Sequence, residues 1–153
     1  MKSIFKKNKL LLRISKQTQK NKYQVQAKGK ILWTDLTVEN ADEIKDFYGS
    51  VIGWTFSEQP VADYVDYNVH NALEPGDECI AGICHKKGSN ANIPAQWLNY
   101  VIVKNLRESL ENCQKLGGKT LDGPRKMGSD MFAVIQDPAG ACLALLETTE
   151  TAN

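Results

Sequence analysis

Two stretches rich in β-branched and aromatic residues, 30–38 and 97–103, are each followed by an apolar stripe at helical spacing. The first stripe contains four residues at positions i, i+3, i+4 and i+7: Ile44, Phe47, Tyr48 and Val51. The second contains Leu106, Leu110, Cys113 and Leu116. Side chains at this spacing share one face of a helix. Each half of the chain is therefore predicted to begin with a strand and a helix that packs against a sheet.

Three further strand candidates follow each predicted helix. In the first half they are Trp54–Glu58, Tyr64–His70 and Glu78–His85, and in the second half Lys119–Leu121, Met131–Gln136 and Ala141–Glu147. The last two strands of each half are separated by turn sequences, Glu74-Pro-Gly-Asp77 and Asp137-Pro-Ala-Gly140. Gly117-Gly118 is expected to end the second helix. The predicted order is β-α-β-β-β, and it occurs twice.

The repeat is also visible at individual positions. Four pairs share one offset along the chain: Val38/Val103, Asn40/Asn105, Glu43/Glu108 and Gly53/Gly118. Both copies contain Asn-x-x-Glu before the helix. This pattern predicts that the Asn side chain accepts from a backbone N–H while the Glu reaches back to the cap. We predict one domain over residues 30–150, with a first module near 30–87, a linker at 88–95 and a second module near 96–147.

Several motifs resemble those of the vicinal oxygen chelate superfamily, which includes glyoxalase I, bleomycin resistance proteins and extradiol dioxygenases. They are Trp33-Thr-Asp-Leu-Thr-Val38, Phe47-Tyr-Gly-Ser-Val-Ile-Gly-Trp54, Gly117-Gly118 and Asp137-Pro-Ala-Gly-Ala141. The resemblance covers residues 30–147. It implies an α+β fold in which two βαβββ modules form an open, curled eight-stranded sheet or barrel around a cavity. Such concave surfaces commonly bind small ligands.

Enzymes of this family hold a divalent metal with His and Glu side chains on the first and last strands of each module. The resemblance places those ligand positions at Trp33, Gly82, Leu98 and Ala144. None of these side chains can ligate such an ion. We therefore expect no metal cofactor at the usual site, although the family normally has one.

The two histidines, His70 and His85, do not restore that site. His85 is three residues beyond Gly82, which places it on the opposite face of the strand. A site built from His70 with Glu74 or Glu78 would differ from the family arrangement. We expect ordinary surface or strand-edge histidines.

The period of two along a strand indicates which side chains line the predicted cavity. The ligand-binding candidates are Trp33, Asp35, Tyr67, Cys84, Tyr100 and Phe132. Tyr67 and Phe132, with Met131 as a further candidate, come from the strands before the last strand of each module, whose register the sequence fixes less well than that of the other strands. This lining suits an aromatic or apolar molecule stacked on rings, and it equally suits a barrel filled by its own core. Asp35 is also a candidate for a general base. The alternative is that it accepts a hydrogen bond between strands or at a dimer interface.

Charge divides the chain differently from the modules. The whole sequence has 19 Lys and Arg against 18 Asp and Glu, but residues 1–30 carry ten of the basic residues and no acid. The acidic remainder argues against a nucleic-acid-binding core. We expect residues 1–29 to form a mobile or loosely docked leader, and any contact with nucleic acid or an anionic surface to involve residues 1–30.

The four cysteines lack the spacing of a zinc site, which favours reduced thiols in the cytoplasm. The apolar stretch of the leader is interrupted at Arg13, so it does not resemble a secretory signal. No apolar run reaches the length of a membrane span. Three functions fit these patterns: a metal-free binder of a small molecule, a lyase, isomerase or dioxygenase with a displaced metal or an Asp35 base, and a dimerising interaction module with a filled barrel. A homodimer is expected, with the modules paired within or between chains.

Overall fold

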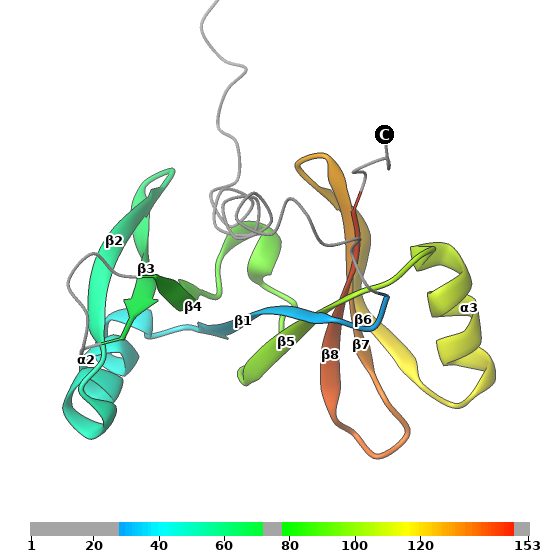
Figure 1. Ribbon diagram of the computed structural model, residues 1–153, viewed down its shortest axis with the longest axis horizontal. Helices are drawn as coiled ribbons and strands as arrows, with labels where there is room; N and C mark the ends of the chain where they lie inside the picture. The colour runs from blue at the N-terminus through cyan, green and yellow to red at the C-terminus, as the bar shows by residue number, and fades with distance from the viewer. Residues whose placement is uncertain (1–27, 72–77, 149–153) are drawn as a thin grey trace, which may run out of the picture. The chain divides into compact units, whose positions relative to one another are not determined.

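The computed structural model describes residues 28–71 and 78–148. The turn predicted at 74–77, and all but the last two residues of the predicted leader, lie outside these ranges. The described elements are β1 (Ile31–Val38), α2 (Ala41–Ile52), β2 (Thr55–Val61), β3 (Tyr64–His70), β4 (Cys79–His85), a 3₁₀ helix (Gly88–Asn90), β5 (Trp97–Ile102), α3 (Leu106–Lys115), β6 (Lys119–Met127), β7 (Asp130–Gln136) and β8 (Cys142–Glu147) (Figure 1). This order confirms the predicted α+β fold with two β-α-β-β-β modules. No described helix has the length and apolar character needed to cross a membrane.

The chain divides into two compact units, and we describe each by itself. Among the described residues, the first unit contains 34–71 and 78–97, and the second contains 28–33 and 98–148. In the first unit the strand order is β2-β3-β4-β1, with β1 parallel to β4 and the other pairs antiparallel. In the second the order is β5-β8-β7-β6, with β5 parallel to β8. The internal repeat therefore extends from sequence to strand pairing, while the domain boundaries and the cavity stay predictions.

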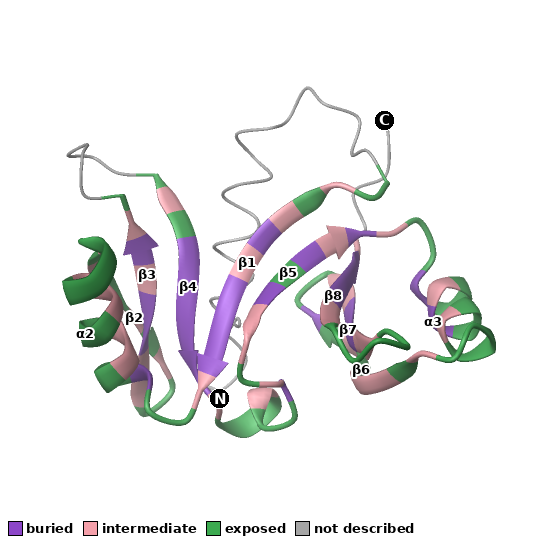
Figure 2. Cartoon of the chain, turned by 90° about the horizontal axis from the view of Figure 1, so that it is seen from below, coloured by how far each residue is buried: buried purple, intermediate pink, exposed green. Residues whose placement is uncertain are grey.

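One face of the first unit's sheet is packed against α2. The core on this face consists of six buried residues: Leu36, Ala41, Tyr67, Val69, Ala81 and Ile83. Ile44 and Tyr48 of α2 pack on it as predicted. Phe47 and Val51, the other two residues of the predicted stripe, do not pack on this core, since they are 53% and 63% exposed. β4 is buried along most of its length (Figure 2).

The second unit repeats this arrangement with α3. Leu106 and Leu110 of the helix are buried against Ala133 and Leu145 of the sheet. Leu116 was expected in the same stripe but is 77% exposed, because α3 ends at Lys115. Gly117 follows with a φ of +87°, which confirms the predicted glycine stop.

The two Asn-x-x-Glu motifs behave differently. Asn105 has an extended backbone, and its Oδ1 accepts from the backbone N–H of Glu108 at 2.9 Å, as predicted. Asn40 has φ −107° and ψ 52° and makes no side-chain cap. Its Nδ2 instead donates to Glu43 Oε2 at 2.9 Å. The cap prediction is wrong at Asn40 because its backbone leaves the extended region that a capping asparagine usually adopts.

Strand β6 is longer than the sequence predicts. The predicted strand ends at Leu121, and the next residues, Asp122-Gly-Pro, are of types common in turns. The strand continues to Met127 because its pairing with β7 shifts register between Thr120 and Asp122 and again between Asp122 and Arg125. These irregularities accommodate the Gly-Pro pair within an edge strand, where proline is tolerated.

Candidate functional site

Strand pairing aligns four residues in a row across the first unit's sheet. Asp35 of β1 is opposite Gly82 of β4, Gly82 is opposite Asn68 of β3, and Asn68 is opposite Ser57 of β2. Alternation along the strands puts this row on the face away from the α2 core. Gly82 contributes no side chain to this row and is itself buried.

Ser57, at one end of this row, is hydrogen-bonded to Asn68 and to His70, which lies two residues beyond Asn68 on β3. Ser57 Oγ lies 2.7 Å from His70 Nε2 and accepts from Asn68 Nδ2 at 3.2 Å. Asn68 Oδ1 and His70 Nδ1 are buried atoms without a hydrogen-bond partner among the described residues. Because most buried polar atoms in proteins are paired, these two atoms identify the Ser57–Asn68–His70 group, which we call the polar cluster, as a place where a ligand could bond.

The predicted residues Asp35 and Cys84 share the face of the polar cluster. Cys84 follows Gly82 by two residues and is opposite Thr37, which is two residues beyond Asp35. Asp35 is 1% exposed and Cys84 is 2% exposed. The strand parity that predicts their common face is therefore correct, and Asp35 places a buried carboxyl group in the row.

The corresponding row in the second unit is mostly apolar. Tyr100 is opposite Ala144, Ala144 is opposite Val134, and Val134 is opposite Asp122. Tyr100 stacks on Phe132 with ring centroids 5.6 Å apart, and both rings are buried. Of the predicted binding residues, the structure thus brings these two together on the sheet face opposite the α3 core.

Tyr67 and Met131 do not lie on the predicted faces. Tyr67 belongs to the core packed against α2, and its hydroxyl donates to Asp42 of that helix. The prediction is wrong because Asn68, rather than Tyr67, is the β3 residue opposite Gly82. Met131 likewise packs with the core against α3. Trp33 is buried and lies two residues before Asp35 on β1, so the two share a strand face.

His85 is buried, in contrast to the expected surface or strand-edge position. Its Nδ1 lies 3.4 Å from Asp66 Oδ1 and its Nε2 lies 3.7 Å from Asp42 Oδ1. Its ring also lies against the ring of Tyr67, a residue of the core packed against α2, which confirms the predicted face opposite Gly82. His85 therefore belongs to the contacts between the sheet and α2, away from the polar cluster.

The Tyr67–Asp42 hydrogen bond shifts the pKa values of both partners. The bond donated by Tyr67 lowers the pKa of Asp42, with His85 contributing in the same direction. The bond to Asp42, together with burial, raises the pKa of Tyr67 from 10.0 to about 12. Burial also raises the pKa of Tyr64, which lies against the His85 ring.

This hydrogen bond predicts a pH-dependent contribution to stability. An unfolded tyrosine loses its proton near pH 10, whereas folded Tyr67 keeps it up to about pH 12. The contribution is therefore complete below pH 10 and is lost between pH 10 and about 12. Tyr67→Phe should lower the free energy of unfolding by about 1–2 kcal/mol at neutral pH and remove this part of the alkaline decline, as measured by urea unfolding across that range.

Tyr48→Phe is the matched control, because the Tyr48 hydroxyl bonds to Trp97 rather than to Asp42. It should retain the alkaline decline of the wild-type protein. If the free energy of unfolding of Tyr67→Phe falls with pH as steeply as that of Tyr48→Phe, the Tyr67–Asp42 hydrogen bond is not the cause of the alkaline decline.

The residues present do not fit the divalent metal that the family implies. Trp33, Gly82, Leu98 and Ala144 offer no ligating side chain. Within residues 28–71 and 78–148, no three His, Cys, Asp or Glu side chains are grouped so that they could hold an ion.

Sequence reasoning missed the polar cluster. The sequence predicts a strand that contains Ser57 but not the sheet face on which Ser57 lies, and it predicts His70 at the end of a strand without a partner. The available signal was the even-numbered parity of Asn68 and His70 on β3. Only the β3–β4 register shows that Asn68 lies opposite Gly82 and that His70 lies opposite Cys79.

Comparison with known proteins identifies the family of this sequence. The model of the Glyoxalase/Bleomycin resistance protein/Dioxygenase superfamily matches residues 30–145. A protein named "Putative glyoxylase CFP32", in both Mycobacterium bovis and Mycobacterium tuberculosis, is 28% identical over 120 residues. The match covers 78% of this chain and 44% of the mycobacterial protein, so this chain spans less than half the length of the curated relatives it matches.

Solved structures also match this chain, at lower sequence identity. A Streptomyces coelicolor methylmalonyl-CoA epimerase variant is 9% identical with a TM-score of 0.47, over 80% of this chain and 99% of that one. TnmS3, an antibiotic binding protein from Streptomyces sp. CB03234, is 18% identical with a TM-score of 0.31, over 75% and 92% of the two chains.

Proposed function

We propose that this chain, which belongs to the Glyoxalase/Bleomycin resistance protein/Dioxygenase superfamily, binds a small organic molecule at the polar cluster of the first unit without a metal ion. The observation that carries the proposal is the pair of buried atoms, Asn68 Oδ1 and His70 Nδ1, that have no partner among the described residues. They flank Ser57, which is exposed, so the cluster combines access with unused hydrogen-bonding capacity.

The cluster favours a ligand that donates hydrogen bonds. Asn68 Nδ2 already donates to Ser57, which leaves the Asn68 carbonyl oxygen to accept. Asp35 adds a buried carboxyl group to the same row, and a neutral ligand avoids bringing a second acidic group toward it. A neutral aromatic molecule with an amide or hydroxyl donor meets these requirements, and its ring would supply the apolar contact area.

Binding can be tested by thermal unfolding with 4-hydroxybenzamide, 2-naphthol and indole as probes. At least one of them should raise the melting temperature, since a ligand that binds only the folded state stabilises it. Asn68→Ala should weaken the binding of a 4-hydroxybenzamide-type donor about fivefold to tenfold, the value of one hydrogen bond.

Asn99→Ala is a control for the loss of a strand asparagine, since Asn99 is exposed on β5 of the second unit. It should bind like the wild-type protein. The proposal fails if no probe stabilises the protein, or if Asn68→Ala and Asn99→Ala bind the probes equally well.

A further inference from the structure

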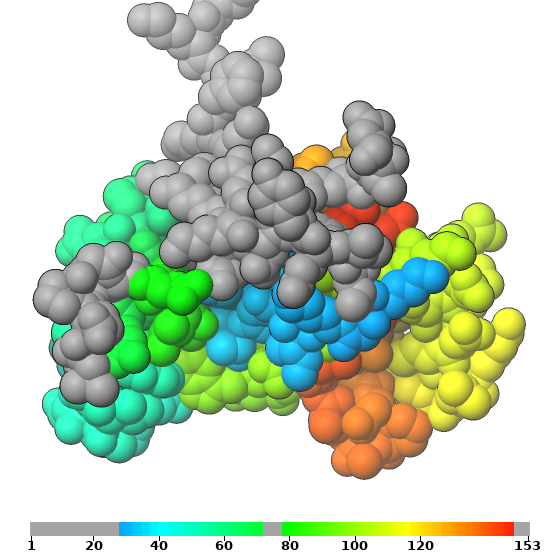
Figure 3. Space-filling model, in the orientation of Figure 1, coloured from blue at the N-terminus to red at the C-terminus, as the bar shows by residue number. Residues whose placement is uncertain are grey.

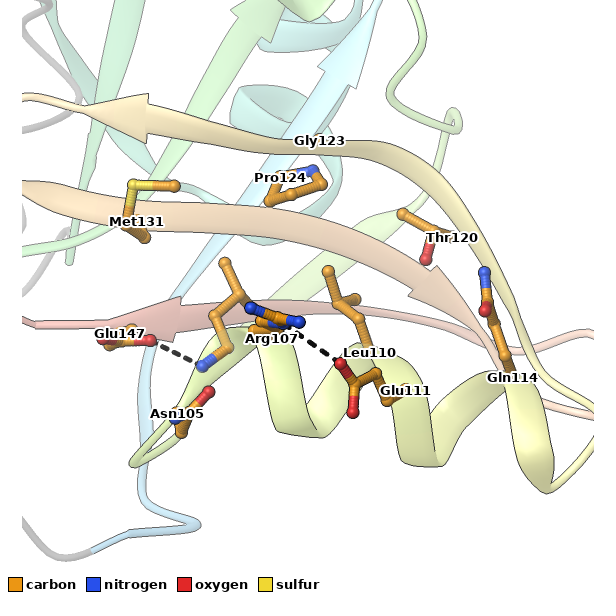
Figure 4. Close-up of a pocket in the computed structure, with 11 residues that line it drawn as sticks. Asn105, Arg107, Leu110, Glu111, Gln114, Thr120, Gly123, Pro124, Met131 and Glu147 are labelled. Carbon is orange, nitrogen blue, oxygen red and sulfur yellow. Dashed lines mark hydrogen bonds and ion pairs between the residues drawn. The ribbon is translucent and has the colours of Figure 1, made fainter.

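The second unit contains a hollow of about 600 Å³ between α3 and the strands β6 to β8 (Figure 4). It lies on the helix side of the sheet, because its wall includes Leu110 and Met131, which belong to the α3 core. This is the face opposite Tyr100 and Phe132. Its volume lies in the range of small-molecule sites. α3 and the start of β6, in yellow-green and yellow, form part of the visible surface (Figure 3).

α3 contacts β6, β7 and β8, and residues of the helix and of these strands together line the hollow. Leu106 and Leu110 anchor the helix on β7 and β8 through Ala133 and Leu145. On the other side of α3, the register shifts of β6 place Gly123 and Pro124 in the wall of the hollow. The side chains of Leu110, Pro124 and Met131 give this hollow an apolar interior.

The charged side chains of the hollow carry one net negative charge. Arg107 lies 3.1 Å from Glu111 through Nε, so these two charges form a pair along the helix. Glu147 lies at the end of the hollow, where its Oε2 accepts from the backbone N–H of Leu106 at 2.5 Å. Because Glu147 already occupies the positive N-terminal end of α3, an incoming anion would meet a carboxylate rather than free N–H groups.

From the apolar interior and the carboxylate at its end, we propose that this hollow is a second binding site, for an apolar molecule that carries an amine. The apolar part lies on Leu110, Pro124 and Met131, and the ammonium group lies near Glu147. The site is separate from the polar cluster, and it does not depend on the function proposed there.

Three probes of equal chain length separate the charge requirement from simple apolar binding: octylamine, octanol and octanoate. At neutral pH the first is a cation, the second is neutral and the third is an anion. Methyl NMR should show octylamine shifting the Met131 and Leu110 signals while the Ile83 signals in the core of the first unit stay unchanged. We expect the affinity order to be octylamine, then octanol, then octanoate.

Glu147→Gln tests the role of the carboxylate, because the amide oxygen of glutamine can still accept from the Leu106 N–H. This variant should bind octylamine about fivefold more weakly, as expected for the loss of a partly exposed ion pair. Glu108→Gln is the matched control, since Glu108 is an exposed carboxylate of the same helix outside the hollow. It should bind octylamine like the wild-type protein.

Each of three results would overturn the proposal. Octylamine could leave the Met131 and Leu110 signals unshifted, octanoate could bind as tightly as octylamine, or Glu147→Gln could bind octylamine as the wild-type protein does. Thermal unfolding of both variants without a probe shows whether they are folded before their affinities are compared.

Discussion

Replacing Phe132 by alanine is expected to lower the free energy of unfolding by about 3–5 kcal/mol. The ring is fully buried, stacks on Tyr100 and lies 4.7 Å from the guanidinium carbon of Arg125. Its removal loses the apolar transfer energy, leaves a cavity and ends both ring contacts. Urea unfolding of the variant and the wild-type protein measures the difference.

Two further variants show whether burial causes this loss. Phe132→Leu keeps most of the side-chain volume and should cost about 1 kcal/mol. Phe47→Ala removes the same ring from an exposed position on α2 and should cost less than about 1 kcal/mol. If Phe132→Ala loses less stability than Phe47→Ala, burial of the Phe132 ring does not stabilise the second unit.

Gly123→Ala is expected to cost about 2–5 kcal/mol for two reasons that act together. Gly123 has a φ of +84°, which an L-residue with a side chain adopts only at a cost. An added Cβ would also lie 2.6 Å from the carbonyl oxygen of Phe132 and 3.1 Å from Ala133 Cα. Both contacts are with backbone, so the β6–β7 pair would have to move apart.

Gly140→Ala separates these two causes. Gly140 has a similar φ of +93°, but nothing lies within 4 Å of an added Cβ. This control should lose only about 1–2 kcal/mol, the conformational part of the cost. Equal losses in urea unfolding for Gly123→Ala and Gly140→Ala would contradict the close backbone approach at β6.

The repeated architecture was predictable because its signals are local. Asn105 and Glu108 mark the start of a helix, Leu106 and Leu110 mark its buried stripe, and Gly117 marks its end within the same short segment. Each signal depends on residues a few positions apart, which the sequence shows directly. The matching positions in the other half, at a fixed offset, reinforce the assignment even though Asn40 does not form the expected cap.

The candidate sites were less predictable because they depend on pairing between distant strands. Asn68 belongs beside Gly82 only through the β3–β4 register, and the same register moves Tyr67 to the α2 face. The hollow under α3 depends on the irregular pairing of β6, where Asp122-Gly-Pro is locally typical of a turn. In both cases the register with the neighbouring strand, and not the local sequence alone, determines where these side chains lie.

The most direct test of the account is the affinity of the best aromatic probe before and after the protein is dialysed against a metal chelator. We expect the same dissociation constant in both samples, with Asn68→Ala weaker than the wild-type protein in each. An affinity that falls at least about tenfold, or 1.4 kcal/mol, on chelation and returns when a divalent metal is added back would contradict metal-independent binding at the polar cluster.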